Sequence, residues 1–135
     1  MNHTQIGDVT EHRFILYCLE HNIPVSKPVN NNLPYDCIID VNGKLLKIQV
    51  KTGYKASSKD TFVFNTRSCS KNFTEVKVKT YDGLIDGFIT WYEQTPDVFY
   101  YIPVEKASAG SMRIYYGKTP TSQQNNGRDY IFMHD

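Results

Sequence analysis

The chain has 135 residues, of which 40% are hydrophobic and 13% aromatic, so it is long and apolar enough to bury one core. Its apolar runs span only a few residues, and the first residues lack the basic-then-apolar pattern of a secretory signal, so neither a membrane-spanning helix nor a classical leader is expected. The length is that of a single domain over residues 1–135. Three widely spaced cysteines (Cys18, Cys37 and Cys69) favour reduced thiols in a cytoplasmic protein.

The formal net charge of +1 conceals an uneven distribution of charge. Nine lysines and arginines lie between Lys44 and Lys79, where only Asp60 and Glu75 oppose them, and the rest of the chain is correspondingly acidic. This asymmetry indicates a surface that faces a polyanion. A solvated, lysine-rich face without a partner would have the same composition.

The first predicted element is a helix over residues 8–22. Thr4 or Asp8 is expected to cap it, and Pro24 follows its end. Apolar residues recur at helical spacing and define the face expected to point inward: Phe14, Ile15, Cys18 and Leu19.

Residues 35–41 and 44–52 are predicted to form an antiparallel hairpin, because Asn42-Gly43 between them is a strong signal for a tight turn. In the second strand Leu46, Ile48 and Val50 alternate with three polar residues, so one face is apolar and the other polar. The polar residues are Lys47, Gln49 and Lys51.

The remaining segments are shorter and are separated by turns. Further strands are expected over residues 61–66, 85–92 and 98–104. The other segments are an extended piece at 25–29, a loop at 53–60, an exposed basic arm at 67–79 and a polar tail at 118–128.

Four polar residues are the candidates for chemistry. Glu11 shares the inward face of the predicted helix, Asp36 opens the first hairpin strand, and Gln49 and Lys51 lie on the polar face of the second. An ideal two-residue hairpin places Asp36 opposite Gln49, and a helix packed on the sheet can bring Glu11 to the same point. Taken singly, each residue also has an ordinary interpretation, as a helix carboxylate, a turn residue or a residue of a half-exposed strand.

Together the four side chains suit phosphodiester hydrolysis. Carboxylate and amide oxygens are the ligands that Mg²⁺ prefers, and a bound metal polarises a phosphate and activates an attacking water. Lys51 would orient the nucleophile or stabilise the charge that develops in the transition state.

The ordered set Pro34-Tyr35-Asp36 and Gln49-Val50-Lys51 resembles the signature of PD-(D/E)XK nucleases, and more closely that of the small homing endonucleases encoded in group I introns. Other segments that look like this family are Gly7 to Glu11, Leu46 to Gly53, Val63 to Ser68, Ile85 to Phe88, Tyr101 to Val104 and Gly110 to Met112.

The resemblance implies an α/β, restriction-endonuclease-like core, in which a central mixed sheet carries the N-terminal helix and peripheral strands. It implies catalytic roles for Glu11, Asp36, Gln49 and Lys51, with Mg²⁺ or another hard divalent cation bound by Asp36, Gln49, Val50 and Glu11. The expected reaction is sequence-specific hydrolysis of both strands of duplex DNA. Because each chain offers one site, the resemblance also implies a homodimer and a tetramer that is a dimer of dimers.

Gln49 departs from the superfamily pattern, where Asp or Glu is usual, although the intron-encoded subset leads one to expect glutamine. A neutral amide binds Mg²⁺ without compensating its charge. A non-catalytic DNA-binding module, or a junction resolvase on the same fold, therefore remains the alternative. The residues expected to contact DNA are Lys55, Arg67, Ser68, Ser70, Lys71, Lys77 and Lys79.

Overall fold

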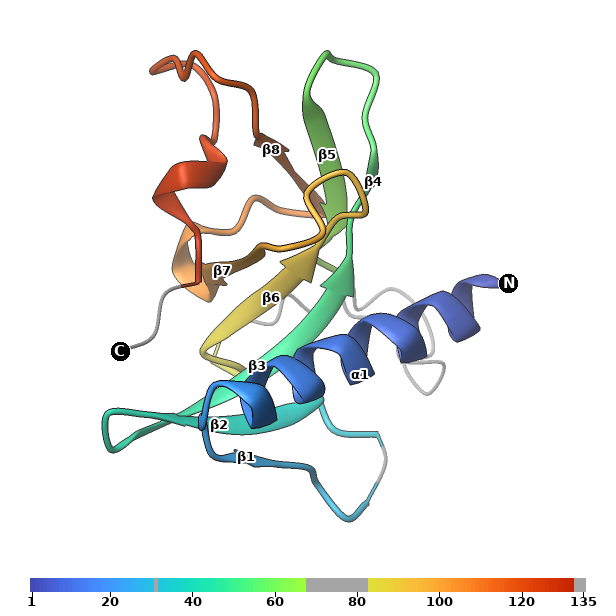
Figure 1. Cartoon of the computed structure of the whole chain (residues 1–135), viewed down its shortest axis with the longest axis vertical. Coiled ribbons are helices and arrows are strands. Elements are labelled where there is room, and N and C mark those ends of the chain that lie inside the picture. Colours follow the sequence, from blue (N-terminus) through green and yellow to red (C-terminus); the bar gives the residue numbers. More distant parts are fainter. Residues whose placement is uncertain (31, 68–82, 133–135) are drawn as a thin grey trace.

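A computed structural model describes residues 1–30, 32–67 and 83–132 of the chain (Figure 1). One helix and eight strands, with two short 3-10 helices, follow one another as α1 (His3–Glu20), β1 (Val25–Ser26), β2 (Cys37–Val41), β3 (Lys44–Thr52), β4 (Tyr54–Lys55), β5 (Thr61–Asn65), β6 (Gly87–Trp91), β7 (Phe99–Pro103), η1 (Val104–Lys106), β8 (Ser111–Tyr115) and η2 (Gly127–Asp129). The strands form a five-stranded sheet in the order β1-β2-β3-β6-β7 and a three-stranded sheet in the order β4-β5-β8. Within the described ranges, no helix is both long and apolar enough to cross a membrane.

Helix α1 begins earlier than the sequence predicted. Asn2 caps it through a capping box, in which the Asn2 side chain accepts a hydrogen bond from the Gln5 N–H at 2.9 Å and the Gln5 side chain accepts one from the Asn2 N–H at 2.9 Å. The predicted start at Asp8, with a cap at Thr4 or Asp8, was therefore wrong. Leu19, which was expected to point inward, is 63% exposed.

The hairpin between β2 and β3 is confirmed. Asn42 and Gly43 have φ values of 54° and 86°, the left-handed conformation that a tight turn with this twist requires, and the Asp40 carboxylate accepts a hydrogen bond from the Gly43 N–H at 2.8 Å. Strand β3 has the predicted bounds, whereas β2 begins at Cys37 instead of Tyr35.

The large sheet is mixed, as predicted. β3 pairs in parallel with β6, while the β1–β2, β2–β3 and β6–β7 pairs are antiparallel. Asp86 ties the start of β6 to β3, because its carboxylate accepts a hydrogen bond from the Lys47 N–H at 2.8 Å and its own N–H donates to the Lys47 carbonyl at 2.9 Å.

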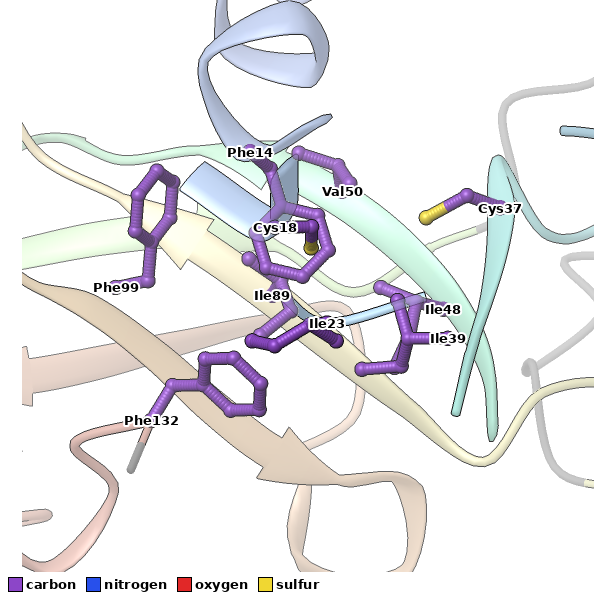
Figure 2. Close-up of a cluster of buried hydrophobic side chains, with 10 residues drawn as sticks. All are labelled: Phe14, Cys18, Ile23, Cys37, Ile39, Ile48, Val50, Ile89, Phe99 and Phe132. Atoms are coloured by element: carbon purple, nitrogen blue, oxygen red, sulfur yellow. The ribbon is translucent and has the colours of Figure 1, made fainter. Parts of the chain in front are cut away.

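Helix α1 packs across the large sheet and buries the main core between them (Figures 1 and 2). Phe14 and Cys18 of the helix are fully buried against Ile48 of β3 and Ile39 of β2. Burial of an aromatic ring of this size stabilises the fold by a few kcal/mol, on the order of 2–3. This packing fixes the position of the helix, and therefore of Glu11, relative to β3.

The small sheet was predicted only in part. Strand β4 lies inside the segment expected to be a loop, and β8 pairs with β5 although no strand was expected there. Gly53 alone separates β3 from β4, so one continuous segment passes from the large sheet into the small one. The Gly53 N–H donates to the Trp91 carbonyl at 2.7 Å, and a Cβ at this position would lie 2.6 Å from the Phe62 ring.

A second core joins the two sheets. Phe62 and Phe64 of β5 and Met112 of β8 are buried against Phe88 of β6 and Ile102 of β7. The C-terminal segment closes this side of the molecule, because the Tyr101 N–H donates to the Tyr130 carbonyl at 2.7 Å. Most of the basic arm predicted at 67–79 lies outside the described residues.

Candidate active site

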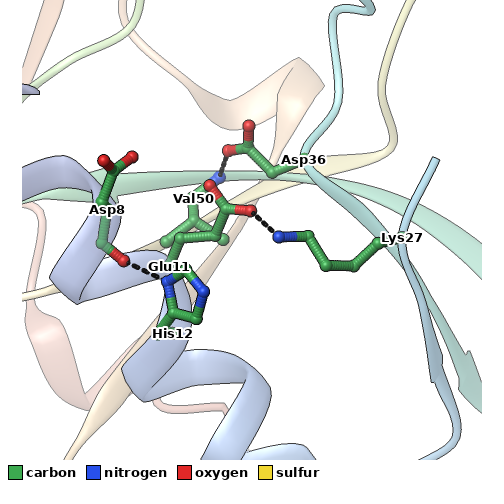
Figure 3. Close-up of polar contacts among 6 residues, drawn as sticks. All are labelled: Asp8, Glu11, His12, Lys27, Asp36 and Val50. Atoms are coloured by element: carbon green, nitrogen blue, oxygen red, sulfur yellow. Dashed lines mark hydrogen bonds and ion pairs between the residues drawn. The ribbon is translucent and has the colours of Figure 1, made fainter. Parts of the chain in front are cut away.

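Asp36 lies just before β2, at the point where β3 continues past that strand. Its N–H donates to the Ile48 carbonyl at 2.8 Å, and its carboxylate accepts a hydrogen bond from the Val50 N–H at 2.8 Å (Figure 3). The antiparallel ladder ends at the pair of Cys37 with Ile48, and the Asp36 N–H donates to the carbonyl of this same Ile48, so the placement of Asp36 opposite Gln49 stays a prediction. Asp36 thus places its carboxylate on a strand backbone that β2 no longer covers.

Glu11 reaches the same point from helix α1. Its side chain is 21% exposed and forms an ion pair with the Lys27 ammonium, with 2.9 Å between Oε1 and Nζ. Figure 3 shows the Glu11 and Asp36 carboxylates and the Lys27 ammonium turned toward one another above β3. The predicted approach of Glu11 to Asp36 is therefore present in the structure.

Lys51 and Gln49 occupy the opposite face of β3. Ile48 and Val50 point into the core beneath α1, and side chains alternate along a strand, so Gln49 and Lys51 point away from the helix. The Lys51 ammonium donates to the Arg67 carbonyl at 3.3 Å. Glu11 on the helix and Lys51 on the polar face of β3 therefore lie on two sides of the sheet, and Asp36 lies at the edge between them.

The electrostatics of Asp36 reflect this arrangement. Burial is the main reason why the pKa of Asp36 is raised from its ordinary value of 3.8 to about 6, and the Glu11 carboxylate contributes to the rise. The hydrogen bond from Val50 opposes that rise, and so do the positive charges of Lys51 and Lys27. Asp36 is thus a carboxyl group whose negative charge lacks full compensation from the protein.

The oxygen atoms around Asp36 fit a hard cation. Asp36 and Glu11 offer carboxylates, and Gln49, on the other face of β3, carries an amide oxygen. Val50 has an aliphatic side chain and can contribute only its backbone carbonyl, which points to the same side of the strand as the N–H bound to Asp36. Within the ranges described, no three Asp, Glu, His or Cys side chains cluster closely enough to hold a metal. Few protein ligands and several waters are what Mg²⁺ accepts.

A polar cleft of about 240 Å³ opens beside the two carboxylates. Its lining residues are Glu11, Lys27, Pro28, Asn30, Asn32, Leu33, Tyr35 and Asp36. Charged and amide groups form much of its wall, so it suits a hydrated ion or a phosphate better than an apolar ligand.

Lys27 is the residue of this site that the sequence interpretation missed. It follows β1, whose pairing of Val25 with Ile39 and Ser26 with Ile38 brings it beside Cys37, next to Asp36. The ion pair with Glu11 raises the pKa of Lys27 above its ordinary value. A third antiparallel strand at 25–29, added to the predicted hairpin, would have indicated this neighbour.

Two of the predicted DNA-contact residues lie within the described chain. Lys55 is exposed on β4, and Arg67 is exposed just beyond β5, where its N–H donates to the Asn65 side chain at 2.6 Å. The others, Ser68, Ser70, Lys71, Lys77 and Lys79, lie outside the described residues. Lys55 belongs to the small sheet and Arg67 follows its strand β5, where the Arg67 carbonyl accepts a hydrogen bond from the Lys51 ammonium.

Comparison with known protein families identifies the family of this chain. The family model of the PD-(D/E)XK endonucleases matches residues 1–130. The chain belongs to the PD-(D/E)XK endonuclease family. No curated protein gives a significant match to this PD-(D/E)XK endonuclease.

The fold of this PD-(D/E)XK endonuclease is similar to that of a bacterial homing endonuclease, I-Ssp6803I. The TM-score is 0.78 at 24% sequence identity, and the match covers 97% of this chain and 89% of that chain. The restriction-endonuclease-like fold expected from the sequence is therefore confirmed, as is the family resemblance. The protein is an endonuclease, DNA is the substrate that its family implies, and nucleases of this family typically use divalent metals.

Proposed function

We propose that this endonuclease hydrolyses both strands of a specific duplex DNA site with a divalent cation, as a homing endonuclease of the kind encoded in group I introns. The observation that carries the proposal is the position of Asp36 where β3 runs beyond β2, with both Glu11 and Lys51 acting electrostatically on its carboxylate. The likeness to I-Ssp6803I supports the choice of homing enzyme within the family.

Asp36 and Glu11 are proposed to hold the cation, with Gln49 and Val50 contributing an amide and a backbone oxygen. Asp36 is already oriented by the Val50 N–H at 2.8 Å, so its second oxygen can face a ligand without rearranging the strand. When bound, Mg²⁺ or another hard divalent ion supplies charge to polarise the scissile phosphate and lowers the pKa of an attacking water.

Lys51 is proposed to act on the substrate itself. Its ammonium lies within electrostatic reach of Asp36 and on the face of β3 that leads to Arg67. From there it would orient the attacking water or stabilise the negative charge that develops on the phosphate. A charged phosphate oxygen would be a stronger acceptor for this ammonium than the Arg67 carbonyl at 3.3 Å.

Recognition of DNA is proposed to involve the small sheet and the basic segment that follows it. Arg67 and Lys55 are exposed there, and the residues that follow Arg67 continue the basic composition. Cutting both strands needs two sites, so we propose a homodimer, and a long target would be covered by a dimer of dimers. Gel filtration of the protein, free and with DNA, tests this; a monomer in both cases would exclude double-strand cleavage by one complex.

Gln49 supports a second candidate, a non-catalytic DNA-binding module. An amide in place of an acid removes one negative charge from the metal site. A protein that no longer cleaves DNA could tolerate this loss. The ionisable residues Glu11, Asp36 and Lys51 argue against this alternative, because a site without catalysis has no need to keep two carboxylates and an ammonium together.

The decisive experiment is cleavage of DNA that carries candidate target sites, with Mg²⁺ and with EDTA. Metal-dependent double-strand breaks are expected from the wild type, with loss of cleavage in Asp36→Ala and Lys51→Ala and retention in Asp97→Ala, a matched change at an exposed turn residue. Binding of the same DNA without any cleavage in Mg²⁺ would establish the non-catalytic alternative. Cleavage of four-way junctions in preference to linear duplex would identify a resolvase.

A further inference from the structure

The ion pair between Lys27 and Glu11 has a feature that a simple surface salt bridge lacks. The Lys27 ammonium lies 2.9 Å from Glu11 Oε1, and it also acts electrostatically on the buried Asp36 carboxylate. A single positive charge therefore interacts with two carboxylates from different parts of the chain, α1 and the residue that precedes β2.

This position is the one that a divalent cation would need. Mg²⁺ is bound by carboxylate oxygens that converge on one point, and one of the two Glu11 oxygens, Oε1, already binds the Lys27 ammonium. A metal ion and an ammonium held side by side would also repel each other at short range. Binding of the one thus opposes binding of the other.

Lys27 is able to leave. Its side chain is 49% exposed, it follows the two-residue strand β1, and it borders the polar cleft of about 240 Å³. The long lysine chain can turn its ammonium into this cleft or into solvent while its backbone stays in place.

We propose that Lys27 is a positioning residue that takes the place of the metal: it holds the Glu11 carboxylate beside Asp36 in the metal-free enzyme and is displaced when the divalent cation enters. This inference rests on the proposed function, because it requires the cation to bind at Glu11 and Asp36. It makes Lys27 a competitor of the metal, and it explains how two carboxylates stay close before any metal is present.

The test is direct binding of Mn²⁺ to the DNA-free protein, in which electron paramagnetic resonance measures the concentration of the unbound ion. Lys27→Gln is expected to bind Mn²⁺ about two- to fivefold more tightly than the wild type, because the energy of a partly exposed ion pair no longer has to be overcome. Lys27→Arg keeps a cation beside Glu11 and is expected to bind Mn²⁺ as the wild type does. Lys106→Gln is the matched control, since Lys106 is exposed in η1, away from the cleft.

A double-mutant cycle identifies Glu11 as the contested ligand. On a Glu11→Gln background, Lys27→Gln is expected to tighten Mn²⁺ binding less than on the wild type, because the oxygen for which both cations compete has lost its charge and only the effect of Lys27 near Asp36 remains. The same tightening on both backgrounds would overturn the inference, as would unchanged or weaker Mn²⁺ binding in Lys27→Gln. A wild type and a Lys27→Gln variant that both fail to bind Mn²⁺ would overturn the metal site itself, and with it the proposed function.

Discussion

Asp36→Asn is expected to stabilise the metal-free protein at neutral pH, although it removes a residue of the candidate site. Burial raises the pKa of Asp36 from 3.8 to about 6, so above pH 6 the native state holds a carboxylate that water would solvate better. That difference corresponds to about 3 kcal/mol at most, at about 1.36 kcal/mol per pH unit. Asparagine keeps an oxygen for the Val50 N–H, so a gain of about 1–3 kcal/mol is expected.

The sign of the pH dependence follows from proton binding. Between pH 3.8 and about 6 the native protein binds more protons at Asp36 than the unfolded chain does, so the wild type loses stability as the pH rises through this window. The advantage of Asp36→Asn is therefore expected to be full above the window and to shrink toward its lower end.

Urea unfolding in EDTA at several pH values across this window measures the effect, with Asp97→Asn as an exposed control expected to stay within about 0.5 kcal/mol of the wild type. Excess Mg²⁺ should reverse the order, because it stabilises only the protein that binds it. A less stable Asp36→Asn protein above pH 6 in EDTA, or a gain independent of pH, would refute the view of Asp36 as an undercompensated carboxylate.

Three further predictions concern the scaffold and can be measured by urea unfolding. Phe14→Ala should lower the free energy of unfolding by about 3–5 kcal/mol, because it leaves a cavity in the core. Leu16→Ala, on the exposed side of α1, should change this free energy by no more than about 0.5 kcal/mol. Equal effects of the two changes would contradict the packing described. Asn2→Ala should cost about 1 kcal/mol by removing the capping box, and Asn2→Ser should restore most of that loss. Gly87→Ala should destabilise the protein, because its Cβ would lie 2.8 Å from the Ile102 carbonyl, and unchanged stability would show that β7 can move away.

The part of the fold that could be predicted is the part encoded by local signals. Asn42-Gly43 determines the turn, and the alternation that follows it determines the length and the faces of β3. Together they predict the register of β2 with β3, which the ladder follows from the pair of Val41 with Lys44 to the pair of Cys37 with Ile48, and the ladder ends before Asp36. The family signature adds the helix carboxylate at Glu11.

What could not be predicted depends on contacts between distant segments. Two residues of β4 have no periodic pattern. In β8, Met112 and Ile114 alternate with Ser111 and Arg113 as in a strand, but the pairing of β8 with β5 is visible only in the fold. The start of α1 is an exception, because Asn2 and Gln5 form a local capping box whose spacing in the sequence is a helix-start signal that was overlooked. Lys27 was missed for the same reason as β8: its neighbours come from strand pairing.

The single residue between β3 and β4 has a mechanical consequence. Gly53 is held by the Trp91 carbonyl on one side and by the Phe62 ring on the other, so the chain has little freedom at this junction. If a DNA duplex bound to the small sheet moved, the displacement would therefore be transmitted to the backbone at Gly53, two residues from Lys51. A rotation of DNA bound there would thus be coupled to the orientation of the Lys51 side chain, because no loop separates β3 from β4.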